Sequence, residues 1–165
     1  MSIKEEPLDQ IGRRIWQIFE NESDEITIFH FLDRDEIDSV AGYFELANYP
    51  AGAVLFKEGE TVNYLGILAN GKLEANHHPT IGDKPIVIAH LEDGAHIGGI
   101  SHPGGRPAMA SIIAEEASEL LVISEDKFNA FADSYPVIAV KILKGIIEVL
   151  TIRLESAIDR VILFY

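Results

Sequence analysis

Several residue types are scarce in this chain of 165 residues, and each scarcity excludes some classes of function. It has no cysteine, which excludes disulfides, thiolate metal sites and a cysteine nucleophile. Its 13 basic residues are outnumbered by 27 acidic ones, and the net charge of -14 argues against nucleic-acid or anionic-membrane partners. No apolar run approaches the roughly 18 residues that span a bilayer, and the acidic N-terminus does not resemble a signal peptide. We therefore expect a cytoplasmic protein with no nucleic-acid or membrane partner.

Both ends of the chain have helical periodicity. Residues 8–20 place apolar side chains at helical spacing. Asp33 stands where an N-cap of a second helix over 33–44 would lie, and Glu36 is at capping-box distance from it. Pro136 suits the first turn of a long helix over 136–165.

Between these helices, short apolar runs alternate with turn residues at intervals of about ten residues, which is typical of a jelly roll or small barrel. A strand is predicted over 54–56, and Asn70-Gly71 between two apolar runs predicts a hairpin. The expected fold class is α+β, a double-stranded β-helix or jelly-roll barrel with N-terminal helices and a long C-terminal helix. We expect one structural domain, with a helical segment over 1–30, a β-roll over 31–135 and the long helix over 136–165.

The predicted C-terminal helix carries two apolar stripes. The first repeats at alternating spacings of four and three, as in a heptad seam, and consists of Leu143, Ile147, Leu150, Leu154, Ala157, Val161 and Phe164. The second lies to one side and consists of Ile138, Ile142, Ile146, Val149 and Ile152. One stripe can cover the barrel while the other meets a second copy; alternatively, both pack within one subunit. A helix of this length extends about 40 Å and would overhang a small barrel, which favours a homodimer through the first stripe.

The segment 98–107 is unusually rich in glycine and proline. Six of these residues occur in it, and apolar, strand-like residues flank it at 86–89 and 112–114. Such a segment predicts a tight loop with at most one helical turn. Its glycines allow backbone N–H groups to approach a ligand, and a short helix N-terminus would favour an anion.

The order of elements and the spaced glycines resemble the cyclic-nucleotide-binding domain family over residues 31–160. Segment 49–60 is similar to the family's opening turn, with Gly52 and Gly59 at its glycine positions. Segment 64–75 is similar to the next hairpin, with Gly71 at its turn. Segments 91–99 and 110–131 resemble the beginning and end of the phosphate-binding cassette. The resemblance implies a sensor domain of the type found in catabolite activator proteins.

Two charged positions of the cassette differ from the family pattern. The resemblance implies a glutamate that binds the ribose hydroxyl and an arginine that binds the cyclic phosphate, but Gly99 and Ala108 stand at these positions. Losing two charge-assisted contacts costs about 3 to 6 kcal/mol, or on the order of 10² to 10⁴ in affinity. Arg106 can replace the missing arginine if it turns inward; otherwise it is a solvated loop residue. Backbone N–H groups and the hydroxyls of Ser101 and Ser111 can still hold an anion or a polar molecule.

The candidate pocket therefore comprises eleven residues. These are Ile97, Gly98, Gly99, Ile100, Ser101, Arg106, Pro107, Ala108, Met109, Ala110 and Ser111. No cofactor is expected, and a cyclic nucleotide is expected only as a weak ligand. The six histidines lack the spacing of a cupin-type metal centre, so we expect no metal and interpret them as exposed or locally paired. No catalytic group is paired at useful spacing, so an enzyme is not expected.

The sequence thus predicts a stand-alone, dimeric regulatory or sensor module with weak or altered ligand binding. In the family, ligand capture shifts the long helix, and another small molecule or a protein partner can act on the same helix here. The chain ends at Tyr165, which is expected to exclude a DNA-recognition helix. The alternative is a protein-interaction or scaffold module with a vestigial pocket.

Overall fold

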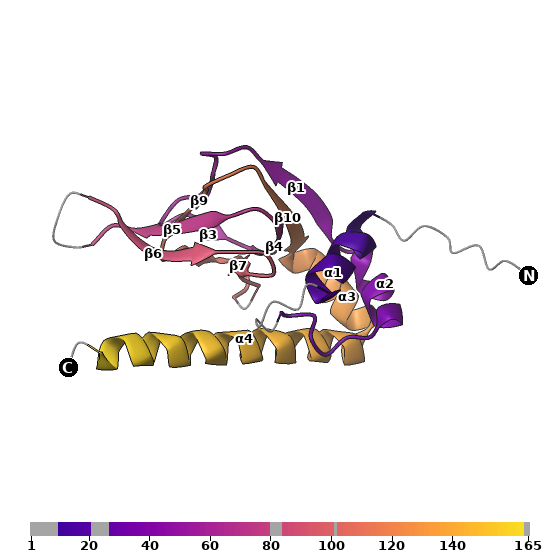
Figure 1. The fold of residues 1–165 in the computed structure, drawn as a ribbon. Coiled ribbons are helices and arrows are strands. Elements are labelled where there is room, and N and C mark those ends of the chain that lie inside the picture. The colour runs from indigo at the N-terminus through magenta and orange to yellow at the C-terminus, as the bar shows by residue number, and fades with distance from the viewer. Residues whose placement is uncertain (1–9, 21–26, 80–83, 101, 164–165) are drawn as a thin grey trace, which may run out of the picture.

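A computed structural model describes residues 10–20, 27–79, 84–100 and 102–163 (Figure 1). The described helices lie at the two ends of the chain and the strands lie between them, as predicted. The helices are α1 (Gln10–Glu20), α2 (Arg34–Ala41), α3 (Glu125–Ser134) and α4 (Pro136–Ile162). The strands are β1 (Glu45–Tyr49), β2 (Val54–Phe56), β3 (Thr61–Val62), β4 (Tyr64–Asn70), β5 (Leu73–His77), β6 (Ile86–Leu91), β7 (His96–Gly98), β8 (Arg106–Pro107), β9 (Ser111–Ala114) and β10 (Ser118–Ser124).

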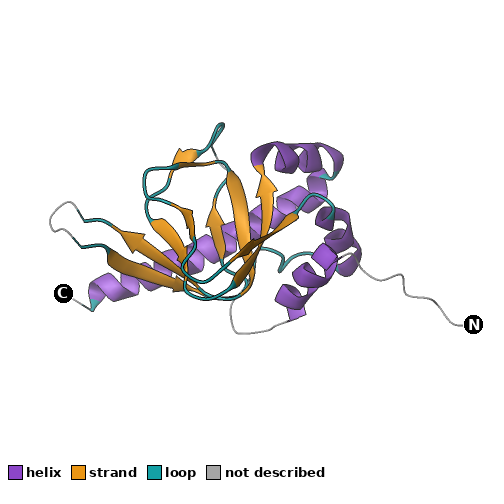
Figure 2. Cartoon of the chain, turned by 90° about the horizontal axis from the view of Figure 1, so that it is seen from above, coloured by secondary structure: helices purple, strands orange, loops and turns teal. Residues whose placement is uncertain are grey.

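The strands form two four-stranded antiparallel sheets, with the orders β1-β10-β4-β7 and β2-β9-β5-β6. A small antiparallel pair, β3-β8, completes the roll. The fold is therefore the α+β jelly roll with flanking helices that the sequence predicts. Figure 2 shows the strands packed as a roll and α4 passing beneath them.

The predicted Asn70-Gly71 hairpin is wrong, although the strands on either side of it are present. β4 pairs with β10 and β7, whereas β5 pairs with β6 and β9. The turn therefore carries the chain from one sheet to the other. A local Asn-Gly signal specifies a sharp reversal, but the pairing of the two strands depends on partners distant in sequence.

The first sheet separates two hydrophobic cores. In β4, Leu65 and Ile67 face the core shared with the helices, while Leu68 faces the interior of the roll. β10 alternates in the same way, with Leu121 toward the helices and Leu120 toward the roll. This arrangement explains why β4 is apolar and buried on both faces rather than alternating with polar residues.

The predicted capping box of α2 is confirmed, since Asp33 accepts a hydrogen bond from the Glu36 backbone and the Glu36 side chain accepts one from the Asp33 backbone, each at 3.0 Å. The helix ends at Ala41, earlier than the predicted residue 44. The two residues that follow Gly42 continue as turns, and Phe44 still lies in the core.

The long helix α4 contributes its buried residues from its first half. Ala139, Ile142 and Gly145 are its buried residues, and Ile138, Ile146 and Val149 pack beside them. At 27 residues it extends about 40 Å. Its second half continues beyond α1, α2 and α3 and runs along the roll (Figure 1). Among the described residues, no helix is both long enough and apolar enough to cross a bilayer.

The first stripe of α4 faces outward. Its large side chains are 43% to 61% exposed; these are Leu143, Ile147, Leu150, Leu154 and Val161. Ala157 is half-buried, and Phe164 lies outside the described residues. The edge strand β6 also exposes apolar side chains, namely Ile86, Val87 and Ile88.

We expect Gly145→Ala to destabilise the protein. A Cβ at this position would lie 2.2 Å from the backbone oxygen of Ile28, so the helix or the loop must move. Overpacking of this kind costs about 1 to 3 kcal/mol, which exceeds the roughly 1 kcal/mol that alanine gains in helix propensity. Urea unfolding measures the difference. Gly42→Ala is the matched control, because no atom lies within 4 Å of its added Cβ; equal stability of wild type and Gly145→Ala would contradict the prediction.

Candidate functional site

The glycine-rich loop connects β7 to β9, and its short strand β8 pairs with β3. Gly98 begins it with a φ of 70°, and a Cβ there would lie 2.3 Å from the backbone oxygen of Tyr64. This contact requires glycine because both the backbone conformation and the space exclude a side chain. The described loop residues form bends, turns and the short strand β8, and none of them forms the single helical turn that the sequence allowed.

Several backbone donors of the loop already have partners within the protein. The donated hydrogen bonds are Gly99 to Tyr64 O at 2.8 Å, Gly104 to Glu125 Oε2 at 3.0 Å, Gly105 to His102 O at 2.8 Å and Ala108 to Glu60 O at 2.8 Å. The loop is thus folded on its own hydrogen bonds, and these four N–H groups are not directed at a ligand. The backbone N–H of Gly99, which was expected to be available to an anion, therefore already donates to Tyr64 O.

The structure brings only part of the predicted pocket together. Ile97 and Ala110 are buried in the core of the roll, and Ala108 packs against the same core. Ile100 packs instead against the core on the helical side. Gly98, Arg106 and Pro107 are exposed, Met109 is 84% exposed, and Ser101 lies outside the described residues. Arg106 is exposed and lies opposite Val62 in the β3-β8 pair.

The two substituted positions differ in their surroundings. Gly99 is half-buried, has no positive φ, and leaves open space where a side chain would begin. Ala108 is half-buried, lies against the core of the roll and is fixed to the turn of residues 58–60, since Gly59 N also donates to Ala108 O at 2.8 Å. Gly99 can therefore carry a side chain without a change in backbone conformation, whereas a longer side chain at Ala108 would have to extend past the core of the roll.

Ser111 takes part in a polar cluster that the sequence did not reveal. Its hydroxyl accepts a hydrogen bond from the Glu58 backbone at 2.9 Å. The Glu58 carboxylate lies 3.0 Å from His77 Nδ1 and accepts the His78 backbone N–H at 2.8 Å. This backbone hydrogen bond, together with the neighbouring histidines, lowers the pKa of Glu58 despite partial burial. Adjacent histidines would point to opposite faces of a strand, so their shared partner was not predictable from spacing.

The phenol of Tyr64 lies beside the same turn. Its ring packs edge-on against Phe56, with 6.3 Å between centroids. Burial, followed by the proximity of Tyr49 and Glu60, raises the pKa of Tyr64 to about 12. The phenol therefore remains protonated and neutral at physiological pH.

His96 precedes the loop and is 7% exposed. Within the described part of the chain, its Nδ1 has no hydrogen-bond partner. Burial and the nearby Arg153 lower the pKa of His96 to about 4. Arg153 comes from α4 and donates to the backbone oxygen of His96 at 3.3 Å, which connects the second half of the long helix to β7.

We expect His96 to make the protein less stable in mild acid. The folded-state pKa of about 4 lies below the ordinary value of 6.5, so the unfolded chain binds a proton that the folded chain excludes. The stabilisation is complete above pH 6.5 and is lost progressively as the pH falls toward 4, by about 3 kcal/mol.

Denaturant unfolding at pH 7.5, 6, 5 and 4 measures this loss. His96→Gln removes the titration and should reduce the acid dependence, whereas the exposed control His30→Gln should leave it unchanged. Parallel pH profiles for wild type and His96→Gln would show that the histidine does not titrate as described.

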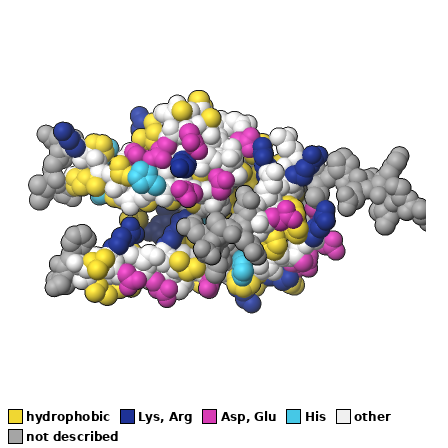
Figure 3. All heavy atoms as spheres, in the orientation of Figure 1, with side chains coloured by type: hydrophobic (Ala, Val, Ile, Leu, Met, Phe, Trp, Pro, Cys, Tyr) yellow, Lys and Arg dark blue, Asp and Glu magenta, His cyan; other side chains and the backbone are white. Residues whose placement is uncertain are grey.

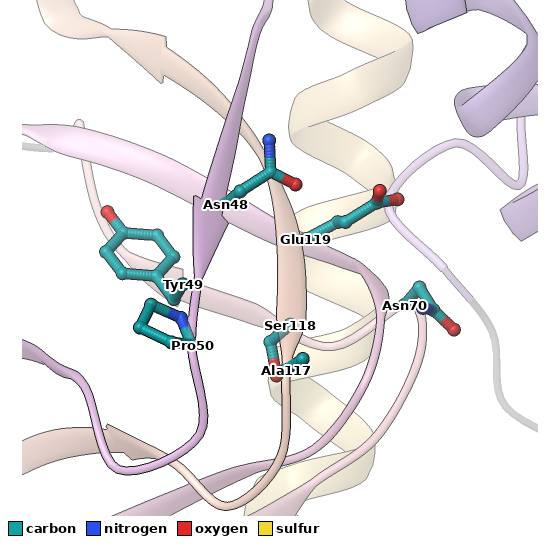
Figure 4. A pocket seen from close by; sticks show the side chains of 7 residues that line it. All are labelled: Asn48, Tyr49, Pro50, Asn70, Ala117, Ser118 and Glu119. Carbon is teal, nitrogen blue, oxygen red and sulfur yellow. The ribbon is translucent and has the colours of Figure 1, made fainter.

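A hollow of about 340 Å³ lies on the first sheet, away from the loop (Figure 4). The row Asn48, Glu119 and Asn70 crosses three neighbouring strands at its edge. Tyr49, Pro50, Ala117 and Ser118 complete its lining. Glu119 also pairs with Arg14 of α1 at 2.8 Å. None of the predicted pocket residues lines this hollow.

Comparison with known proteins places the glycine-rich loop within a known domain. Residues 46–135 match the model of the cyclic nucleotide-binding domain. This chain belongs to the cyclic nucleotide-binding domain family. The glycine-rich loop is therefore called the cassette from here on.

Related proteins extend this assignment. The chain is 29% identical over 112 residues to the cyclic AMP receptor protein of Thermus thermophilus, and 27% identical over 126 residues to cGMP-dependent protein kinase 2 of Mus musculus. These matches cover 68% and 76% of this chain but only 51% and 16% of the relatives. The chain thus spans about half or less of the curated relatives it matches.

Solved structures share the fold. A cyclic nucleotide-binding domain from Methylobacillus flagellatus superposes with a TM-score of 0.79 at 24% identity, covering 93% of this chain and 85% of that chain. The catabolite activator protein of Thermus thermophilus superposes with a TM-score of 0.69 at 27% identity, covering 83% of this chain and 62% of that chain.

Proposed function

We propose that this chain is a regulatory module whose cassette binds cyclic nucleotides weakly or has changed its ligand. The neutral residues Gly99 and Ala108 carry this proposal, because they stand where the family places a glutamate and an arginine. The solvent exposure of Arg106 supports it, since this side chain is not buried in the roll beside Ala108. Four N–H groups of the cassette already donate within the protein, which supports it further.

Acidic side chains near the cassette also disfavour the binding of a cyclic nucleotide. Glu58 and Glu60 lie in the turn that is hydrogen-bonded to Ala108, close to where the family pattern would place the phosphate. Two carboxylates repel an anionic phosphate, and the net charge of -14 adds to this repulsion. A neutral or cationic small molecule would be favoured over a cyclic nucleotide by the same groups.

We expect calorimetry to find cyclic AMP and cyclic GMP binding weaker than about 100 µM to the wild-type chain, because two charge-assisted contacts are missing. The double variant Gly99→Glu/Ala108→Arg restores both charges, and should raise affinity by on the order of 10² or more. The matched control Gly99→Gln/Ala108→Leu adds similar volume without charge and should gain little.

Wild-type binding tighter than about 10 µM would refute the proposal of a weakened site. If such binding were also lost in Arg106→Ala, Arg106 would be the replacement cation. Absence of binding to wild type, the charged double variant and the neutral control would favour a vestigial pocket and an interaction module.

We also propose a homodimer through α4. Its first stripe keeps a heptad repeat and its large side chains are 43% to 61% exposed. Four residues of the second stripe contact the protein's own core, namely Ile138, Ile142, Ile146 and Val149, whereas Ile152 is 40% exposed. A second copy that contributes the same stripe would bury both, as in a two-stranded coiled coil.

Light scattering on the untagged chain should give twice the 18.2 kDa mass of one copy. Leu150→Asp places a charge in the middle of the stripe and should give a monomer. Ser156→Asp adds the same charge to an exposed position of the same helix outside the stripe, and should remain a dimer. A monomeric wild type would end the dimer proposal and favour a different protein as the partner of α4.

A further inference from the structure

Three side chains that can each offer a metal ligand lie together on the outer face of the second sheet. Glu74 of β5 lies directly opposite His90 of β6, and both point away from the roll, because their neighbours Leu73, Ala75 and Ala89 pack inside it. Glu115 follows β9 and is fixed beside β5 by its backbone hydrogen bond to Lys72 O at 2.9 Å. Three separate strands thus bring two carboxylates and an imidazole to one place.

The ligand atoms of these three residues all lie within 4.8 Å of one another. His90 Nδ1 is 2.6 Å from Glu115 Oε1, so the imidazole already contacts one carboxylate. Asn76, which is 9% exposed, donates to Glu74 Oε1 at 2.6 Å and leaves the second oxygen of Glu74 available. A buried amide that orients a carboxylate in this way is typical of the outer shell of a metal site.

Two carboxylates within 4.8 Å of the imidazole make this face locally negative. Lys72 pairs with Glu92 at 4.0 Å one step along the same strands, and its charge is therefore partly neutralised. Glu74 and Glu115 repel one another, and the single imidazole between them offsets only part of this repulsion. Figure 3 shows several acidic side chains gathered on the face of the roll that this view presents.

The donor set distinguishes between classes of cation. Calcium and magnesium prefer oxygen ligands only, whereas zinc and similar divalent transition metals accept imidazole nitrogen together with carboxylate oxygen. Bond lengths near 2.0 Å in a tetrahedral site place ligand atoms about 3.3 Å apart, so the cluster must contract slightly. The His90 side chain is 64% exposed and can make this adjustment.

We propose that Glu74, His90 and Glu115 form a binding site for one Zn²⁺ ion or a similar divalent transition metal, with water as the remaining ligand. The ion ties the edge strand β6 to β5 and to the end of β9. This site is separate from the cassette and is independent of cyclic-nucleotide binding.

Titration calorimetry of the untagged chain with ZnCl₂ tests the proposal. We expect one ion per chain, with affinity at least tenfold lower in Glu74→Gln, Glu115→Gln and His90→Ala. Because all three are surface substitutions, circular dichroism should show an unchanged fold in each. The midpoint of thermal unfolding should rise with Zn²⁺ in wild type and rise less in these variants.

Two matched controls locate the ion. Glu116→Gln removes the neighbouring exposed carboxylate and should leave affinity unchanged. His78→Ala removes a histidine of the Glu58 cluster and should also have no effect. The proposal is overturned if wild type binds no Zn²⁺ at 1 mM, if the three ligand variants bind as wild type does, or if His78→Ala alone abolishes binding.

Discussion

The contact between Gly145 and the backbone of Ile28 determines the shape of the molecule. It brings α4 close enough to the helical core for Ala139 and Ile142 to be buried, so the first half of the helix is rigidly attached. The direction of the second half is then fixed as well, since a continuous α-helix does not bend freely. The exposure of the Leu150 stripe and the contact of Arg153 with β7 both result from this one close approach.

Much of the fold was predictable because its signals are local. The capping box of Asp33 and Glu36, the proline that begins α4 and the two stripes of α4 depend on spacings of three or four residues. The Asn70-Gly71 hairpin failed for the opposite reason. A turn residue specifies where the chain reverses, but sheet membership depends on β10 and β9, which lie about 40 to 50 residues later in the chain. The spacing of the short strands indicated a jelly roll or small barrel, and the resemblance added the order of the flanking helices.

The sequence predicted where the glycine-rich loop lies in the chain, but it did not predict the contacts that its residues make. The predicted tight loop between two strands is present, but Ile100 packs against the core on the helical side, and the Ser111 hydroxyl accepts a hydrogen bond from the Glu58 backbone. His90 illustrates what spacing cannot show. Glu74, His90 and Glu115 lie 16 and 25 residues apart, and only the antiparallel register of β5 and β6 makes the first two direct neighbours. From sequence spacing alone the histidines were interpreted as exposed or locally paired, which describes His90 but does not reveal its place between two carboxylates.

The edge strand β6 has a consequence for the behaviour of the protein at high concentration. Its outer backbone groups and the side chains of Ile86, Val87 and Ile88 offer a template for intermolecular strand pairing. The excess of acidic residues opposes such contacts through long-range repulsion between molecules. Acidification toward the isoelectric point and concentrated salt both weaken this repulsion. Colloidal stability of the protein thus depends on its charge rather than on a covered sheet edge.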